Sequence, residues 1–121
     1  MLEASEDSPY VLLNSQTGKL MLNGRCIMSD TLPFQNAILE WFRKYISVIN
    51  REFELEINLE YINSDSHKML LHLIAELNKY FIFGKKVSIN WITVEEDEYM
   101  MEVIQEFKEA FDLPINEKIL A

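Results

Sequence analysis

The segment "FELEINLEYI" at residues 53–62 places the strongest constraint on the fold of this chain. Its apolar and polar side chains alternate, with Phe53, Leu55, Ile57, Leu59 and Tyr61 on one side and Glu54, Glu56, Asn58 and Glu60 on the other. This period of two is typical of a β-strand with one buried face and one face toward water. The segment therefore predicts a sheet that is covered mainly on one side.

Three other segments have the apolar spacing of helices. Residues 34–49, 69–81 and 99–111 each carry apolar side chains at steps of three and four residues, which is the spacing of one helical face. In the third segment, either Tyr99 or Met100 begins the buried stripe. The acidic run before it suits the positive end of a helix dipole.

Further strands are expected on both sides of these helices. Two short apolar runs at 9–13 and 19–23 predict a hairpin, with Gly18 available for a positive φ angle. Residues 23–24, Asn-Gly, are a second turn signal. Val87, Ile89 and Trp91 alternate with polar residues and predict another strand.

The element order predicts an α/β fold. The segments read ββαβαβα, with a loose tail after Pro114. Strands joined by a helix run parallel, and their crossovers are expected to be right-handed. Because the strands keep a polar side, we expect a two-layer domain, with a small mixed sheet of about four strands and helices mainly on one face. Residues 1–121 show no repeat or linker and are expected to form one domain.

Charge and composition exclude several classes of partner. The chain has 20 acidic and 11 basic residues, a net charge of −9, so it lacks the basic clusters that bind nucleic acid or anionic membranes. Cys26 is the only cysteine and cannot form an intrachain disulfide. The acidic start does not resemble a signal peptide, and no apolar run is long enough to span a bilayer. We expect a soluble cytoplasmic protein.

Signals for catalysis, metals or nucleotides are weak. His67 and His72 are five residues apart, which places them about 140° apart around a helix and unable to share a metal easily. Cys26 has no partner, and no glycine-rich loop is present for a nucleotide. The sequence predicts no catalytic residues, no cofactor and no metal.

The polar cluster "NSDS" at residues 63–66 stands between an expected strand and an expected helix. Asn63 or Ser64 could simply cap the helix, which these residue types do well. A helix start also stabilises a phosphate through its free N–H groups and dipole, so Ser64 could instead be a phosphorylation site. The residue types alone leave both interpretations open.

The motifs along the chain resemble those of a known family. They are "TGKLMLNGR", "FQNAILEWFRKYI", "LEYINSDSHKML", "GKKVSINW" and "VIQEFKEAFDLPI". Together they resemble the SiaC-type regulatory phosphoproteins of bacteria, which have a STAS-like architecture. The most specific motif is "YINSDSHK", in which family members show a Tyr, an apolar residue, Asn, Thr or Ser, a small residue, Ser, and then a Lys two positions later. Here these positions are Tyr61, Ile62, Asn63, Ser64, Asp65, Ser66 and Lys68.

The resemblance implies a phosphorylation switch. The hydroxyl directly after the Asn is the family's acceptor, which corresponds to Ser64, and Ser66 is the alternative because Asp65 replaces the small residue. Tyr61, Asn63, Asp65, His67 and Lys68 would surround the switch. In the family, a dedicated kinase adds the phosphate and a metal-dependent phosphatase removes it. In members linked to biofilm control, the unphosphorylated form binds and activates a diguanylate cyclase.

The sequence thus predicts a non-enzymatic regulatory phosphoprotein whose phosphorylated serine controls binding to a signalling partner. One alternative is a constitutive interaction scaffold, in which Ser64 is only a helix cap. Another is a small enzyme that uses Asp65, His67 and either Ser64 or Ser66. It is the weaker alternative, because neighbours at a helix start rarely converge on one point.

Overall fold

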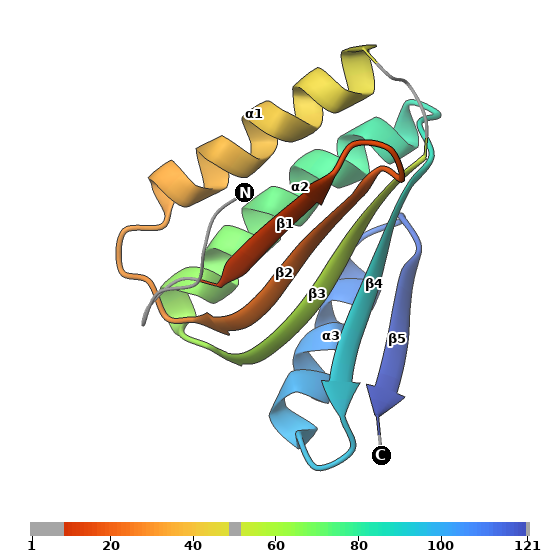
Figure 1. Cartoon of the computed structure of the whole chain (residues 1–121). Helices are drawn as coiled ribbons and strands as arrows, with labels where there is room; N and C mark the ends of the chain where they lie inside the picture. The colour runs from red at the N-terminus through yellow and green to blue at the C-terminus, as the bar shows by residue number, and fades with distance from the viewer. Residues whose placement is uncertain (1–8, 49–51, 121) are drawn as a thin grey trace.

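The computed structural model describes residues 9–48 and 52–120. Residues 1–8, and Ile49 at the end of the first expected helix, lie outside the described residues. The elements are β1 (Tyr10–Asn14), β2 (Lys19–Cys26), α1 (Leu32–Val48), β3 (Phe53–Ile62), α2 (Ser64–Ile82), β4 (Val87–Val94), α3 (Glu98–Ala110) and β5 (Ile115–Leu120). The expected ββαβαβα order is confirmed, and it is followed by an additional strand (Figure 1).

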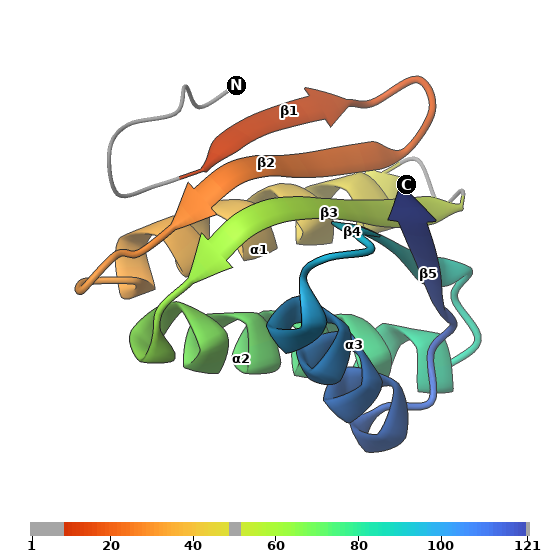
Figure 2. The same ribbon diagram turned by 90° about the horizontal axis from the view of Figure 1, so that it is seen from below.

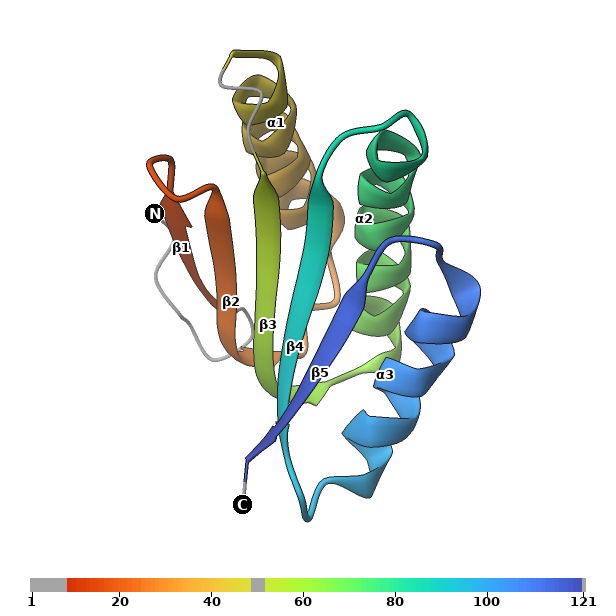
Figure 3. The same cartoon turned by 90° about the vertical axis from the view of Figure 1, so that its right-hand side faces the viewer.

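The strands form one mixed sheet in the order β1-β2-β3-β4-β5. The pair β1–β2 is antiparallel, as in the expected hairpin, and the other three pairs are parallel. Parallel crossovers are almost always right-handed. Because each crossover here advances to the next strand in the same direction, all three helices lie on one face of the sheet (Figures 2 and 3). The predicted two-layer α/β architecture is confirmed.

The core lies between the sheet and the helices. The expected inner face of α2 is buried, since Leu70, Leu73 and Leu77 are at most 1% exposed. Two aromatic pairs join the helices to the sheet. Phe42 of α1 meets Phe53 of β3 with ring centroids 4.7 Å apart, and Trp91 of β4 meets Phe107 of α3 at 5.1 Å. These edge-on contacts between helices and strands hold the helices against the sheet.

The expected loose tail is instead a strand, so the sheet has five strands. β5 runs parallel to β4, with register from Ile89 opposite Ile115 to Val94 opposite Leu120. The prediction of a tail was wrong because three successive residues of "INEKIL" are polar and break the alternation. An edge strand has only one neighbour, and here the backbone ladder to β4 stabilises it despite the weak apolar pattern.

A bulge changes the direction of the side chains at the end of β3. Opposite Gly24 the register shifts by one residue, and Glu60 is left without a partner on β2. An extra residue in one strand sends the following side chains to the opposite face. Tyr61, predicted on the buried side, is therefore 53% exposed, while Ile62 is buried. Gly24, predicted in a turn, instead lies inside β2 with a φ of +119°.

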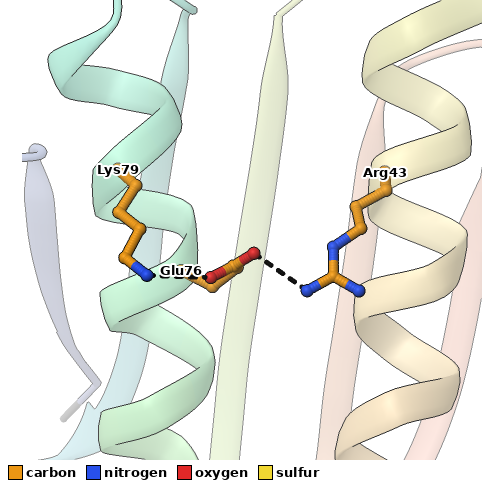
Figure 4. A network of polar contacts seen from close by, with 3 residues as sticks. All are labelled: Arg43, Glu76 and Lys79. Carbon is orange, nitrogen blue, oxygen red and sulfur yellow. Dashed lines mark hydrogen bonds and ion pairs between the residues drawn. The ribbon is translucent and has the colours of Figure 1, made fainter.

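A charged network joins α1 to α2 on their solvent side (Figure 4). Nη2 of Arg43 lies 2.9 Å from Oε1 of Glu76, and Nζ of Lys79 lies 3.5 Å from Oε2 of the same carboxylate. The hydrogen bond from Arg43 holds the pKa of Glu76 below its usual value, although partial burial opposes this effect. The two helices are thus linked by an ion pair as well as by packing.

Candidate functional site at the start of helix α2

Asn63 is the residue that caps α2. Its Oδ1 accepts a hydrogen bond from the Ser66 N–H at 2.9 Å, and its Nδ2 donates to the Met28 carbonyl at 3.2 Å. The Asn63 N–H also donates to the Cys26 carbonyl at 3.1 Å. Asn63 therefore both satisfies the helix start and ties it to the segment that follows β2. Of the two capping candidates, Asn63 takes the role, and the Ser64 hydroxyl does not.

The two serines of the cluster have opposite environments. Ser64 is the first residue of α2 and is exposed, whereas Ser66 is fully buried. The Ser66 Oγ has no hydrogen-bond partner of ordinary geometry among the described residues. It faces the buried thiol of Cys26, whose pKa is raised by burial, an effect that the Ser66 hydroxyl opposes. Only the Ser64 hydroxyl is open to a second protein.

An open hollow of about 580 Å³ lies beside Ser64. Its lining comes from the end of β3, the start of α2 and one residue of α3: Tyr61, Ile62, Asn63, Ser64, His67 and Tyr99. Tyr61 and Tyr99 both line it, and these residues are 53% and 54% exposed. The bulge in β3 is what places Tyr61 on this surface. Two exposed aromatic side chains beside one exposed hydroxyl form a surface suited to protein recognition.

Tyr99 is the residue of this hollow that the sequence motif did not include. The sequence left Tyr99 and Met100 as alternatives for the buried stripe of α3, and Met100 is the buried one. Asp97 caps α3 by accepting a hydrogen bond from the Met100 N–H at 2.9 Å, which fixes the phase of the helix. Within the acidic run before α3, this capping role belongs to Asp97. It also turns Tyr99 outward.

His67 joins α2 to α3. Its Nε2 lies 3.1 Å from Oε1 of Glu106, and its ring meets the ring of Phe107 edge-on at 5.5 Å. The other histidine of the helix, His72, is exposed and does not line the hollow. The structure thus brings Tyr61, Asn63, Ser64 and His67 together. Asp65 and Lys68 are exposed on α2 without lining the hollow.

This arrangement does not resemble a catalytic site. Ser66 is sealed in the core, Asp65 points to solvent, and the His67 Nε2 is engaged with Glu106, so the groups do not converge on one reacting atom. Within the described part of the chain, no three His, Cys, Asp or Glu side chains are grouped so that they could hold a metal ion. No helix in the same residues is long and apolar enough to cross a membrane.

Comparison with solved structures shows the same fold in SiaC of Pseudomonas aeruginosa. The structure is similar to SiaC of Pseudomonas aeruginosa in its crystal structure with the diguanylate cyclase SiaD, with a TM-score of 0.91, 21% identity and 98% of both chains covered. The apo-SiaC crystal structure from the same organism has a TM-score of 0.86 and 20% identity, covering 97% of this chain and 95% of SiaC.

Sequence comparison agrees over almost the whole chain. An uncharacterized protein of Pseudomonas aeruginosa (strain UCBPP-PA14) is 22% identical over 113 residues, which cover 93% of this chain and 90% of that protein. Residues 2–119 match the family model described as SiaC family regulatory phosphoprotein. The chain therefore belongs to the SiaC family of regulatory phosphoproteins.

Proposed function

We propose that the whole chain acts as one non-enzymatic regulatory domain, in which phosphorylation of Ser64 controls binding to a signalling partner. The observation that carries this proposal is the contrast between the two candidate acceptors. Ser64 is exposed directly after the capping Asn63, whereas Ser66 is fully buried. A kinase could reach Ser64 in the folded protein, while access to Ser66 would require the helix start to open.

The position of Ser64 explains how a phosphate would act without unfolding the protein. Phosphoserine carries a charge of about −1.5 to −2 at pH 7, and the first turn of a helix stabilises negative charge. The N–H groups of Ser64 and Asp65 have no hydrogen-bond partner among the described residues. The phosphate would therefore leave the helix intact and change only what can dock beside it.

The partner that best suits this proposal is a diguanylate cyclase. The chain belongs to the SiaC family, and the SiaC of Pseudomonas aeruginosa is found in a complex with the diguanylate cyclase SiaD as its activator. In our proposal the unmodified protein binds and activates the cyclase in the cytoplasm, and so raises cyclic di-GMP output in biofilm control. A cognate kinase and a metal-dependent phosphatase set the phosphorylation state.

The surface around Ser64 supports loss of binding on phosphorylation. A partner that covers the rings of Tyr61 and Tyr99 must also bury Ser64, since all three line one hollow. Burying a neutral hydroxyl costs little, but burying an unpaired phosphate dianion costs much more. The unmodified form should therefore bind, and the phosphorylated form should not.

The direct test is calorimetric affinity for a diguanylate cyclase from the same host. Protein carrying phosphoserine at position 64 should bind at least about tenfold more weakly than unmodified protein, a change of about 1.4 kcal/mol. Phosphoserine at position 15 is the charge-matched control. Ser15 is exposed in the β1–β2 turn, at the opposite end of the parallel strands, and its modification should leave the affinity unchanged.

Substitutions at the same position sharpen the test. Ser64→Ala should retain binding, and Ser64→Asp, with one charge instead of two, should weaken it partially. Equal affinity of the phosphorylated and unmodified proteins would reject the switch and favour the constitutive scaffold. Intact-mass measurement of protein isolated from its host tests the modification itself, because a single added phosphate is expected.

A further inference from the structure

His67 is placed to interact with a phosphate on Ser64. It follows Ser64 by three residues, and side chains three apart on a helix are neighbours. Helical side chains lean toward the N-terminus, which is the direction of Ser64 from His67. Both residues line the same open hollow.

The two ring nitrogens of His67 have different surroundings. Nε2 meets Oε1 of Glu106 at 3.1 Å, whereas Nδ1 has no hydrogen-bond partner among the described residues. A neutral imidazole has one N–H donor, and a protonated imidazole has two. His67 can therefore hold Glu106 and a second anion together only when it is protonated.

We propose that the hollow receives the phosphate of phosphorylated Ser64, and that His67 binds this phosphate through Nδ1 while Nε2 holds Glu106. The inference rests on the proposed modification of Ser64 and assigns the residue that receives it. Phosphorylation then has two results: it places a dianion in the hollow, and it fastens α2 to α3 through one protonated ring. The modified protein presents a more rigid surface as well as a more negative one.

Other charged and titratable groups surround His67 and compete in this interaction. They are its sequence neighbours Asp65 and Lys68 on α2, Glu106 on α3, and Tyr61 and Tyr99, which line the same hollow. Lys68 is the rival cation, because it is four residues after Ser64. It is exposed and absent from the lining of the hollow, whereas the ring of His67 is 22% exposed and braced by Phe107. Binding to His67 therefore requires less ordering of a flexible side chain.

The test is an NMR titration of both histidines in protein with phosphoserine incorporated at position 64 during synthesis. An opposite charge within hydrogen-bond distance raises a histidine pKa, and we expect the pKa of His67 to rise by about one pH unit or more relative to unmodified protein. His72, exposed on the same helix, is the internal control and should change by no more than about 0.3. Equal changes at both histidines would overturn the inference.

Two matched variants identify the cation. The second pKa of a phosphoserine is about 6, and a bound cation lowers it, which phosphorus NMR can follow. We expect His67→Gln to bring this pKa back toward 6 and Lys68→Gln to leave it nearly unchanged. The reverse result would make Lys68 the phosphate ligand and exclude His67.

The same proteins separate this inference from the proposed function. The phosphoserine is introduced without a kinase or a partner, so the titration does not depend on either. A rise in the His67 pKa without loss of cyclase affinity would support the phosphate site and reject the switch. Loss of affinity without that rise would reject the phosphate site and leave the switch in place.

Discussion

Two of the polar links between α2 and its neighbouring helices differ in kind. Arg43 and Glu76 join α1 to α2, with the nitrogen and oxygen 2.9 Å apart. His67 and Glu106 join α2 to α3 at 3.1 Å. An arginine stays charged at every pH relevant to a cell, whereas a histidine changes charge near neutrality.

Of the two links, the one that contains a histidine lies beside Ser64, the proposed phosphorylation site. Glu76 lies three turns along α2 from Ser64, and the arginine link does not reach the hollow. The histidine link borders the hollow directly. One helix thus has a connection to α1 that contains an arginine and a connection to α3 that contains a histidine. Substitutions in α2 and at its cap test this contrast.

The largest effect on the free energy of unfolding is expected in the buried core under α2. Leu73 is fully buried on α2 between His67 and Glu76 in sequence. Leu73→Ala should lower the free energy of unfolding by about 2 to 5 kcal/mol, because it leaves a cavity under the helix. Urea denaturation measures this change. A nearly neutral result would contradict the assigned inner face of α2.

Removal of the α2 cap should have a smaller and more local effect. Asn63→Ala should cost about 1 to 2 kcal/mol, since it removes the bonds to Ser66 and to the segment after β2. Asp97→Ala is the matched control, because it removes the cap of α3 instead. Hydrogen exchange should increase in the first turn of α2 only for the Asn63 variant. The same increase in both variants would mean that the hollow is not organised locally.

The ion pair between Arg43 and Glu76 should contribute less to the free energy of unfolding, and its contribution should depend on pH. Glu76 has a lowered pKa in the folded protein, so its contribution is present above the usual carboxyl value of 4.5 and is lost as the pH falls through the lower folded value. Glu76→Gln should cost up to about 1 kcal/mol at pH 7, because Arg43 is partly exposed. The stability difference from the unmodified sequence should disappear in acid. A difference that persisted at pH 2 would assign it to packing instead.

The smallest effect is expected at Ser64 itself. Asn63 is the cap and the Ser64 side chain is exposed, so Ser64→Ala should change the free energy of unfolding by less than about 0.5 kcal/mol. A change this small in the free energy of unfolding is at the low end of the cost of losing a helix cap. Thermal unfolding checks it. A larger loss would show that the hydroxyl has a structural role, and binding data for this variant would then need a different control.

Much of the layer architecture could be predicted from the sequence. The alternation in β3 and the stripe of α2 follow from burial on one side, which is a local property of the pattern. The exposure of the Tyr61 side chain could not be predicted in this way. Its direction depends on a bulge, and the bulge depends on how β3 pairs with β2 opposite Gly24. No periodicity within one strand contains that information.

The candidate site was predicted in part for the same reason. The motif around Ser64 is contiguous, so its residues were found together. Tyr99 and Glu106 reach the site from α3, more than thirty residues later, and only the packing of two helices brings them there. Ser66 likewise faces Cys26, which lies on β2 and is distant in sequence. Whether Ser66 is exposed or buried could therefore not be predicted from the cluster "NSDS" alone.

The strand order of the sheet has a consequence for how this chain can fold. Among the five described strands, each strand after β1 pairs with the strand that precedes it along the chain. Each new strand can therefore pair with the free edge of the strand made before it. No strand has to insert between two strands that are already paired. Each parallel pair nevertheless joins strands that are separated by a helix, with Lys19 opposite Glu54 and Phe53 opposite Val87, and such non-local pairing slows folding. Such a chain can assemble from its N-terminal hairpin onward as it leaves the ribosome.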